Sequence, residues 1–351
     1  MSGTYDRIAG LPLRLEGYAL ERLALPLAPE FTRVTTVLTL HGAGEEGAGE
    51  DVVYDEVDHE AQLAAGPALP LAGDWTLDGL ARHLDGLALF TAEPVRDFSH
   101  NYRRWAFESA ALDLALRQAG ASLADALGLT PRPVTFVVSM RLDDPPDAGR
   151  VRRLLERTPG LRFKLDPTDD WSPALIDELA GMGVVDTLDM KGAYDEVPFG
   201  VPTEPRVYEA VVARFPGAWI EDPKLTPPLR EALRGAEDRV TWDAPIHSVA
   251  DVRALEWAPR MINVKPSRIG PLRELMATYD HLRAHGIGAY GGGQTELGPG
   301  RGQIQYLASL FHPDGPNDVA PGGYNDPRSP DGLPGSPLPV AASPTGFRWG
   351  V

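Results

Sequence analysis

The sequence of 351 residues contains no cysteine. This absence excludes disulfides, a cysteine nucleophile and cysteine-ligated zinc, so a metal ion would need oxygen or imidazole ligands. The eight histidines show no zinc-binding spacing, and the pair His281 and His285 lacks the glutamate of an HExxH pattern. We therefore expect the chemistry to depend on Lys, Arg, Asp or Glu, and the histidines to have structural or surface roles.

The chain also lacks long apolar segments and an excess of positive charge. No apolar run approaches the ~20 residues of a membrane span, and the first residues do not resemble a signal sequence. Lys and Arg total 33 against 50 Asp and Glu, and the net charge of −17 repels phosphate backbones and anionic lipids. We expect a cytoplasmic protein that binds a small molecule and neither nucleic acid nor membranes, with homo-oligomerisation left open.

Residues 131–310 alternate short β-rich runs with helical segments, from VTFVVSMRL at 134–142 to GIGAYGGG at 286–293. Seven strand-plus-helix units follow one another at intervals of roughly two to three dozen residues. This pattern favours a (β/α) barrel over a doubly wound sheet. The Pro- and Gly-rich residues 311–351 predict an irregular tail.

The first 130 residues have a different pattern, typical of an α+β domain. Strands are predicted at 18–27 and 33–42, and a helix over about 103–128, whose first part ends at Gly120. The acidic, glycine-rich stretch from Glu45 to Glu60 is expected to be a solvated loop.

Five predicted barrel strands end in charged residues, which are Lys164, Asp189, Glu221, Asp243 and Lys265. Taken singly, each lysine is better explained by a side chain that reaches solvent, and each carboxylate by a helix cap. Single buried charges are costly, but the carboxyl ends of barrel strands converge on one mouth, where barrel enzymes hold their catalytic groups. Together the five residues therefore predict one catalytic site.

The three carboxylates Asp189, Glu221 and Asp243 are hard oxygen ligands of the kind that Mg²⁺ prefers. A bound Mg²⁺ would hold a substrate carboxylate and stabilise the enediolate that forms when the α-proton leaves. In strand order, Lys164 and Lys265 stand on opposite sides of the acidic trio, so one can remove the proton and the other can return it.

The order of these motifs resembles the enolase superfamily and its mandelate racemase/muconate lactonizing enzyme-like members. Within it, the resemblance is to the muconate lactonizing enzyme subgroup, which includes o-succinylbenzoate synthases, N-acylamino acid racemases and dipeptide epimerases. WAFESAALDLALRQAGASLADALG is similar to the last helix of the family's capping domain, IEDP and NVKPSRIG to its fourth and sixth strands, and GGQTELGPGR to its seventh. The resemblance implies an α+β capping domain (1–130), a modified TIM-type (β/α) barrel (131–310) and a tail (311–351) that returns towards the cap.

The resemblance also implies Mg²⁺-dependent abstraction of a proton α to a carboxylate, by a racemase, epimerase or syn-dehydratase that acts on an N-acylamino acid or an o-succinylbenzoate-type substrate. Lys164 and Lys265 would be the acid and base. Glu296 matches an acidic residue that the family places beside the strand-six lysine, and Asn263 shares a strand face with Lys265. Cap residues 31–33 and 52–54 would touch the substrate.

Three positions depart from the family pattern. Arg162 stands where the first lysine of Lys-x-Lys is usual, and a register shifted by two would put Asp166 in place of the catalytic lysine; we favour Lys164. Lys191 stands where relatives commonly have Asn, and it would compete with Mg²⁺ or grip a substrate anion. Pro271 replaces a glycine.

Two alternatives therefore remain open. One is an enolase-like binding protein, non-catalytic or metal-independent, in which Lys191 displaces the metal. The other is a lyase that forms a Schiff base through Lys265.

Overall fold

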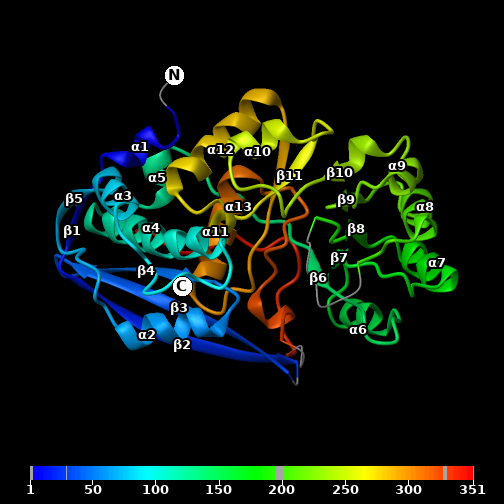
Figure 1. The fold of residues 1–351 in the computed structure, drawn as a ribbon, viewed down its shortest axis with the longest axis horizontal. Helices are drawn as coiled ribbons and strands as arrows, with labels where there is room; N and C mark the ends of the chain where they lie inside the picture. Colours follow the sequence, from blue (N-terminus) through cyan, green and yellow to red (C-terminus); the bar gives the residue numbers. More distant parts are fainter. Residues whose placement is uncertain (1–2, 29, 194–200, 327–329, 351) are drawn as a thin grey trace.

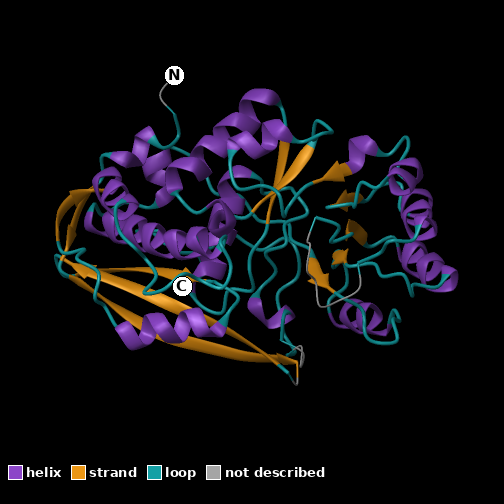
Figure 2. Ribbon diagram, viewed as in Figure 1, coloured by secondary structure: helices purple, strands orange, loops and turns teal. Residues whose placement is uncertain are grey.

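A computed structural model describes residues 3–28, 30–193, 201–326 and 330–350. An antiparallel sheet with helices on it forms one part of the molecule, and short parallel strands surrounded by helices form the other (Figures 1 and 2). The first part is the cap and the second is the barrel. No helix within the described residues is long and apolar enough to cross a lipid bilayer.

The cap contains a three-stranded antiparallel sheet in the order β2-β3-β4 and a separate β1-β5 pair. Its strands are β1 (Pro12–Leu15), β2 (Gly17–Ala28), β3 (Phe31–Gly42), β4 (Glu45–Asp51) and β5 (Gly73–Thr76). Its helices are α1 (Asp6–Ala9), α2 (Glu56–Ala65), α3 (Leu77–Asp85), α4 (Ser99–Gln118) and α5 (Leu123–Leu127). The helix predicted over 103–128 is thus two helices, separated at Gly120, whose φ is +64°.

The prediction of a solvated loop from Glu45 to Glu60 was wrong. Residues 45–51 are strand β4 and residues 56–60 begin α2, while Glu50 and Asp51 are fully buried. The glycines suggested a loop. They stand in a strand because α4 lies directly on this strand. A Cβ on Gly49 would come within 2.1 Å of the carbonyl oxygen of Ala106 in α4.

The barrel strands are parallel and pair in the orders β10-β9-β8-β7-β6 and β11-β12. They are β6 (Val138–Met140), β7 (Phe163–Leu165), β8 (Val185–Asp189), β9 (Trp219–Glu221), β10 (Val240–Thr241), β11 (Met261–Val264) and β12 (Gly288–Gly291). The barrel helices are α6 (Gly149–Arg157), α7 (Pro173–Met182), α8 (Pro205–Arg214), α9 (Pro227–Ala232), α10 (Val249–Ala254), α11 (Pro266–Ile269), α12 (Leu272–His285) and α13 (Pro299–Phe311). Short 3-10 turns cover Glu237–Arg239 (η1) and Gly322–Tyr324 (η2).

Main-chain hydrogen bonds join the two groups of parallel strands into a ring. The Asn263 N–H donates to the Trp242 carbonyl oxygen at 2.9 Å, which links β10 to β11. On the other side, the Asp318 N–H donates to Gly291 and the Val137 N–H donates to Asn317, both at 2.8 Å. Residues 317–318 therefore fill the gap between β12 and β6, and the strand ends meet around one mouth.

The end of the chain lies against the cap helix α4. The Phe347 N–H donates to the Asp113 carboxylate at 2.7 Å, and Arg348 forms an ion pair with the same carboxylate at 2.9 Å. The cap and the barrel are thus held together by the C-terminal residues as well as by their direct contact.

Candidate active site

The five charged residues at the strand ends are all buried, with at most 8% of each exposed to solvent. Lys164 is in β7, Asp189 and Glu221 are the last residues of β8 and β9, and Asp243 follows β10. Lys265 follows β11 and is the N-cap residue of α11. Because each strand contributes its carboxyl end, the side chains gather at one end of the barrel.

Lys164 lies among carboxylates. Its ammonium nitrogen is 3.0 Å from Asp189 Oδ2 and 3.7 Å from Asp318 Oδ2, and it donates to Glu221. Burial alone would lower the pKa of Lys164, but Asp189 and Glu221 outweigh burial and raise the pKa well above its ordinary value. The Tyr290 hydroxyl donates to the other oxygen of Glu221. The protein by itself therefore holds Lys164 as an ammonium.

Lys265 lies on the other flank of the carboxylates. Its ammonium nitrogen is 2.8 Å from Asp243 Oδ2, and Arg268 donates to Asp243 Oδ1. Burial would raise the pKa of Asp243, but Arg268 and Lys265 hold it well below its usual range. Asp243 is thus an anion between two cations.

Lys191 enters the same cluster from the loop after β8. Its ammonium pairs with Asp189 and lies 3.8 Å from Asp166 Oδ2, while its main-chain N–H donates to Asp189 Oδ1 at 3.1 Å. Its backbone is left-handed, with φ of +53°. Burial would raise the pKa of Asp189, but Lys164 and Lys191 keep it below its ordinary value.

Three carboxylates at the barrel mouth are close enough to hold one metal ion. Ligand oxygens of Asp189, Glu221 and Asp222 all lie within 4.8 Å of one another, and all three residues are buried. Oxygen donors suit a hard divalent cation such as Mg²⁺, so this donor set fits the metal that the family resemblance implies.

Asp222 is a member of this group that the sequence did not reveal. Strand alternation would point it away from Glu221, but its φ of +45° turns the chain at that point. Its oxygens accept the N–H groups of Asp243 and Ala244, each at 2.9 Å. Burial and then the charges of Asp243 and Asp189 raise the pKa of Asp222 to about 7.

Asn263 lies beside the cluster, and both polar atoms of its buried side chain have no hydrogen-bond partner among the described residues. The glycine run after β12 allows this approach, because a Cβ on Gly292 would lie 2.6 Å from Asn263 Oδ1 and 2.7 Å from Lys265 Cε. An unpaired buried amide is unfavourable unless another group forms hydrogen bonds with it. The Asn263 side chain is therefore available to a ligand.

Two other predicted residues, Arg162 and Glu296, form ion pairs with residues other than Lys164 and Lys265. Arg162 precedes β7, pairs with Asp186 and donates to the Gly183 carbonyl oxygen at 2.8 Å. Glu296 forms an ion pair with Arg301 at 3.1 Å and accepts the Gln294 N–H at 2.6 Å.

The cap reaches the barrel through the loop after β12. Arg33 is fully buried and donates to the Gln294 carbonyl oxygen at 2.9 Å and to main-chain oxygens of Val52 and Val53. The Tyr54 hydroxyl donates to Gln294 Oε1 at 2.5 Å. Both cap segments predicted to touch substrate, 31–33 and 52–54, thus lie beside this loop.

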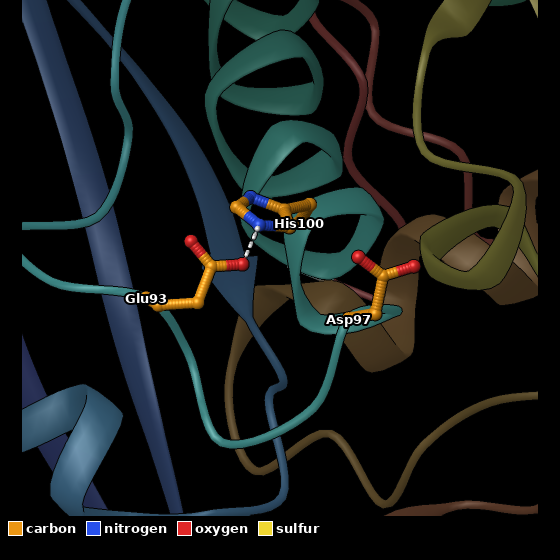
Figure 3. Close-up of side chains that lie close together, drawn as sticks. All are labelled: Glu93, Asp97 and His100. Atoms are coloured by element: carbon orange, nitrogen blue, oxygen red, sulfur yellow. Dashed lines mark hydrogen bonds and ion pairs between the residues drawn. The ribbon is translucent and has the colours of Figure 1, made fainter.

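A second group of potential metal ligands lies on the cap surface and consists of Glu93, Asp97 and His100 (Figure 3). His100 Nε2 is 3.5 Å from a Glu93 oxygen, and all three residues are exposed. Exposed carboxylates are well hydrated without a metal, so we assign this cluster no role.

Two family models match the chain. The "Domain of unknown function (DUF8230) C-terminal domain" covers residues 130–326, and the corresponding N-terminal domain covers residues 6–126.

Among individual proteins, the N-succinylamino acid racemase of an Amycolatopsis species is 28% identical over 97% of this chain and 95% of its own length. The dipeptide epimerase of Enterococcus faecalis superposes with a TM-score of 0.66 at 15% identity, covering 95% of this chain and 99% of its own. The muconate lactonizing enzyme of Pseudomonas putida superposes with a TM-score of 0.59 at 20% identity, covering 87% and 88%. The two superpositions establish a shared fold.

Proposed function

Since this chain belongs to the DUF8230 family, and within the enolase superfamily to the muconate lactonizing enzyme subgroup, we propose that it is an enzyme that removes a proton α to a carboxylate. The product would be the racemised or epimerised substrate. An N-acylamino acid is the preferred substrate class, because the racemase of Amycolatopsis aligns with nearly the whole chain. An o-succinylbenzoate-type substrate and a syn-dehydration remain the second choice.

The observation that carries the proposal is the position of two lysines on opposite flanks of one acidic cluster. Lys164 contacts Asp189 and Glu221, and Lys265 contacts Asp243. A planar enediolate can accept a proton from either face, so a lysine on each flank allows inversion at the α-carbon. Lys164 and Lys265 would exchange the roles of base and acid according to the hand of the substrate.

A divalent cation, expected to be Mg²⁺, would be held by Asp189 and Glu221, with Asp243 or Asp222 as the third carboxylate. When bound, it would supply positive charge for the developing enediolate. The same carboxylates would then hold the Lys164 proton less tightly, and a neutral lysine is the form that acts as a base.

We expect α-proton exchange in D₂O to reveal the substrate. Proton NMR would follow N-acylamino acids, dipeptides and hydroxy acids of each hand, with and without Mg²⁺. Lys164→Ala and Lys265→Ala should each slow exchange by roughly 10²–10⁴-fold for one hand of the substrate, because each removes the base on one face. The exposed Lys224 provides the control variant Lys224→Ala. Exchange that survives unchanged in both catalytic variants would refute the two-base proposal.

The contact between Lys191 and Asp189 favours a second candidate function. The Lys191 ammonium already pairs with Asp189, a carboxylate that the metal would need. Lys164 pairs with Glu221, and Lys265 pairs with Asp243. In this candidate, the protein is metal-independent or non-catalytic and binds an anionic small molecule at the same mouth.

A further inference from the structure

A cavity of about 590 Å³ lies where strand β6 and helix α6 meet the cap and the C-terminal segment. Leu27 near the end of β2 contributes a wall from the cap, and Tyr324 contributes one from the C-terminal segment. Figure 1 shows α6 beside these two parts of the chain. The lysine–carboxylate residues do not line this cavity, but it lies at the carboxyl ends of strands, since Arg141 follows β6 and Thr295 follows β12.

The lining of this cavity is strongly positive in a strongly negative protein. Among the described residues, the lining contains Arg141, Arg150, Arg153 and Arg157 and one carboxylate, Asp143, whereas the whole chain carries a net charge of −17. Three of the arginines are three or four residues apart in α6, so they share one face of the helix. This arrangement concentrates guanidinium groups around one open cavity.

Two of the three arginines of α6 have an exposed carboxylate near them. Arg153 is 4.0 Å from Asp143, and Arg157 is 3.6 Å from Asp331, whose side chain is 90% exposed. Arg150 is half-buried and donates to the Tyr324 carbonyl oxygen at 3.5 Å, a neutral acceptor that does not balance its charge.

The cavity also touches the strand next to the catalytic lysine. Ser139 of β6 lines it and is the register partner of Lys164 in β7. On another side it is lined by Thr295, from the loop that holds Arg33 of the cap. A substrate at the mouth can therefore reach the arginines with an extended group.

We propose that this arginine-lined cavity binds a small oxyanion that carries more than one negative charge, such as a phosphate or a pair of carboxylates. The anion would be the distal group of the substrate whose α-carbon lies between Lys164 and Lys265, and this assignment to the substrate rests on the proposed function. Several guanidinium groups match a multiply charged oxyanion in both charge and geometry.

Calorimetric titration with inorganic phosphate at constant ionic strength tests the cavity without requiring catalysis. Arg150→Gln and Arg153→Gln should each weaken phosphate binding about tenfold, because each removes a charge-assisted hydrogen-bond donor. Arg153 is well exposed, so this variant keeps the fold. The matched control is Arg152→Gln on the same helix, since Arg152 pairs with Glu178 and does not line the cavity. Equal binding by all three variants and the wild type, or no binding by the wild type, would overturn the proposal.

Competition then identifies the source of the anion. N-acylamino acids whose acyl chain ends in a phosphonate should displace phosphate in the wild type, whereas analogues that end in a carboxamide should not. Charged analogues that fail to displace phosphate would overturn the assignment to the substrate and leave a site for the free anion. If no compound exchanges its α-proton, the proposed function fails. The phosphate titration still shows whether the cavity binds an anion.

Discussion

Four cationic side chains compensate the carboxylates of the mouth. Lys164, Lys191, Lys265 and Arg268 each contact Asp189, Glu221 or Asp243. Buried ions cost several kcal/mol of desolvation unless they are paired, so removal of one partner changes what the remaining charges bind.

Substitution of Lys191 separates the two candidate functions. Lys191→Asn should raise the affinity for Mg²⁺ by about tenfold or more, because it removes an ammonium from Asp189 and leaves a carboxylate for the metal. Calorimetric titration with MgCl₂ would measure the change. Lys224→Asn is the control for the loss of one positive charge. An unchanged Mg²⁺ affinity in Lys191→Asn would contradict competition between Lys191 and the metal.

Among the elements, β4 shows how a helix determines the composition of a strand. Gly47 and Gly49 face α4, and a Cβ at Gly47 would lie 2.3 Å from the Leu114 nitrogen. The strand pairs with β3 along its whole length, so the backbone cannot retreat from the helix without loss of hydrogen bonds.

We expect Gly49→Ala to lower the free energy of unfolding by about 2–4 kcal/mol, since the new methyl group would overlap the backbone of α4. Gly181 in α7 has open space around it, so Gly181→Ala should raise the free energy of unfolding by about 0.5–1 kcal/mol. Urea unfolding followed by circular dichroism measures both. Equal effects of the two substitutions would show that packing on α4 does not require glycine.

The closure of the whole barrel depends on buried hydrogen bonds of the Asn317 and His312 side chains. Asn317 Oδ1 accepts the Gly291 N–H at 2.6 Å, and it lies 2.7 Å from His312 Nδ1, which must therefore be the donor. His312 Nε2 then accepts from the Tyr279 hydroxyl at 3.1 Å. Burial lowers the pKa of His312 to about 4, so this histidine is neutral in the folded protein.

This neutral histidine predicts acid-dependent loss of stability. The unfolded chain, with a histidine pKa of 6.5, binds more protons than the folded chain, so the stabilisation is complete above pH 6.5 and is lost as the pH falls towards 4. Between pH 7 and pH 5 the wild type should lose about 2 kcal/mol that His312→Gln does not lose. Urea unfolding at both pH values measures this difference, with the exposed His285→Gln as control. The same pH dependence in wild type and His312→Gln would refute this origin.

The sequence alone was sufficient to predict the fold class and the strand ends that carry charge. Strand alternation, helical spacing and the order of motifs such as IEDP and NVKPSRIG are local properties, so they can be read along the chain. The enolase-like fold predicted from them is confirmed by the structural relatives. The roles of Lys164 and Lys265 stay predictions.

Only the tertiary structure decided which charges meet. The left-handed backbone at Asp222 brings a fourth carboxylate into the cluster, and packing against α4 makes a glycine-rich segment a strand. The arginine-lined cavity combines residues from the cap, α6 and the C-terminal segment. Sequence periodicity reports which face of an element is buried, but it does not report what another element places against that face.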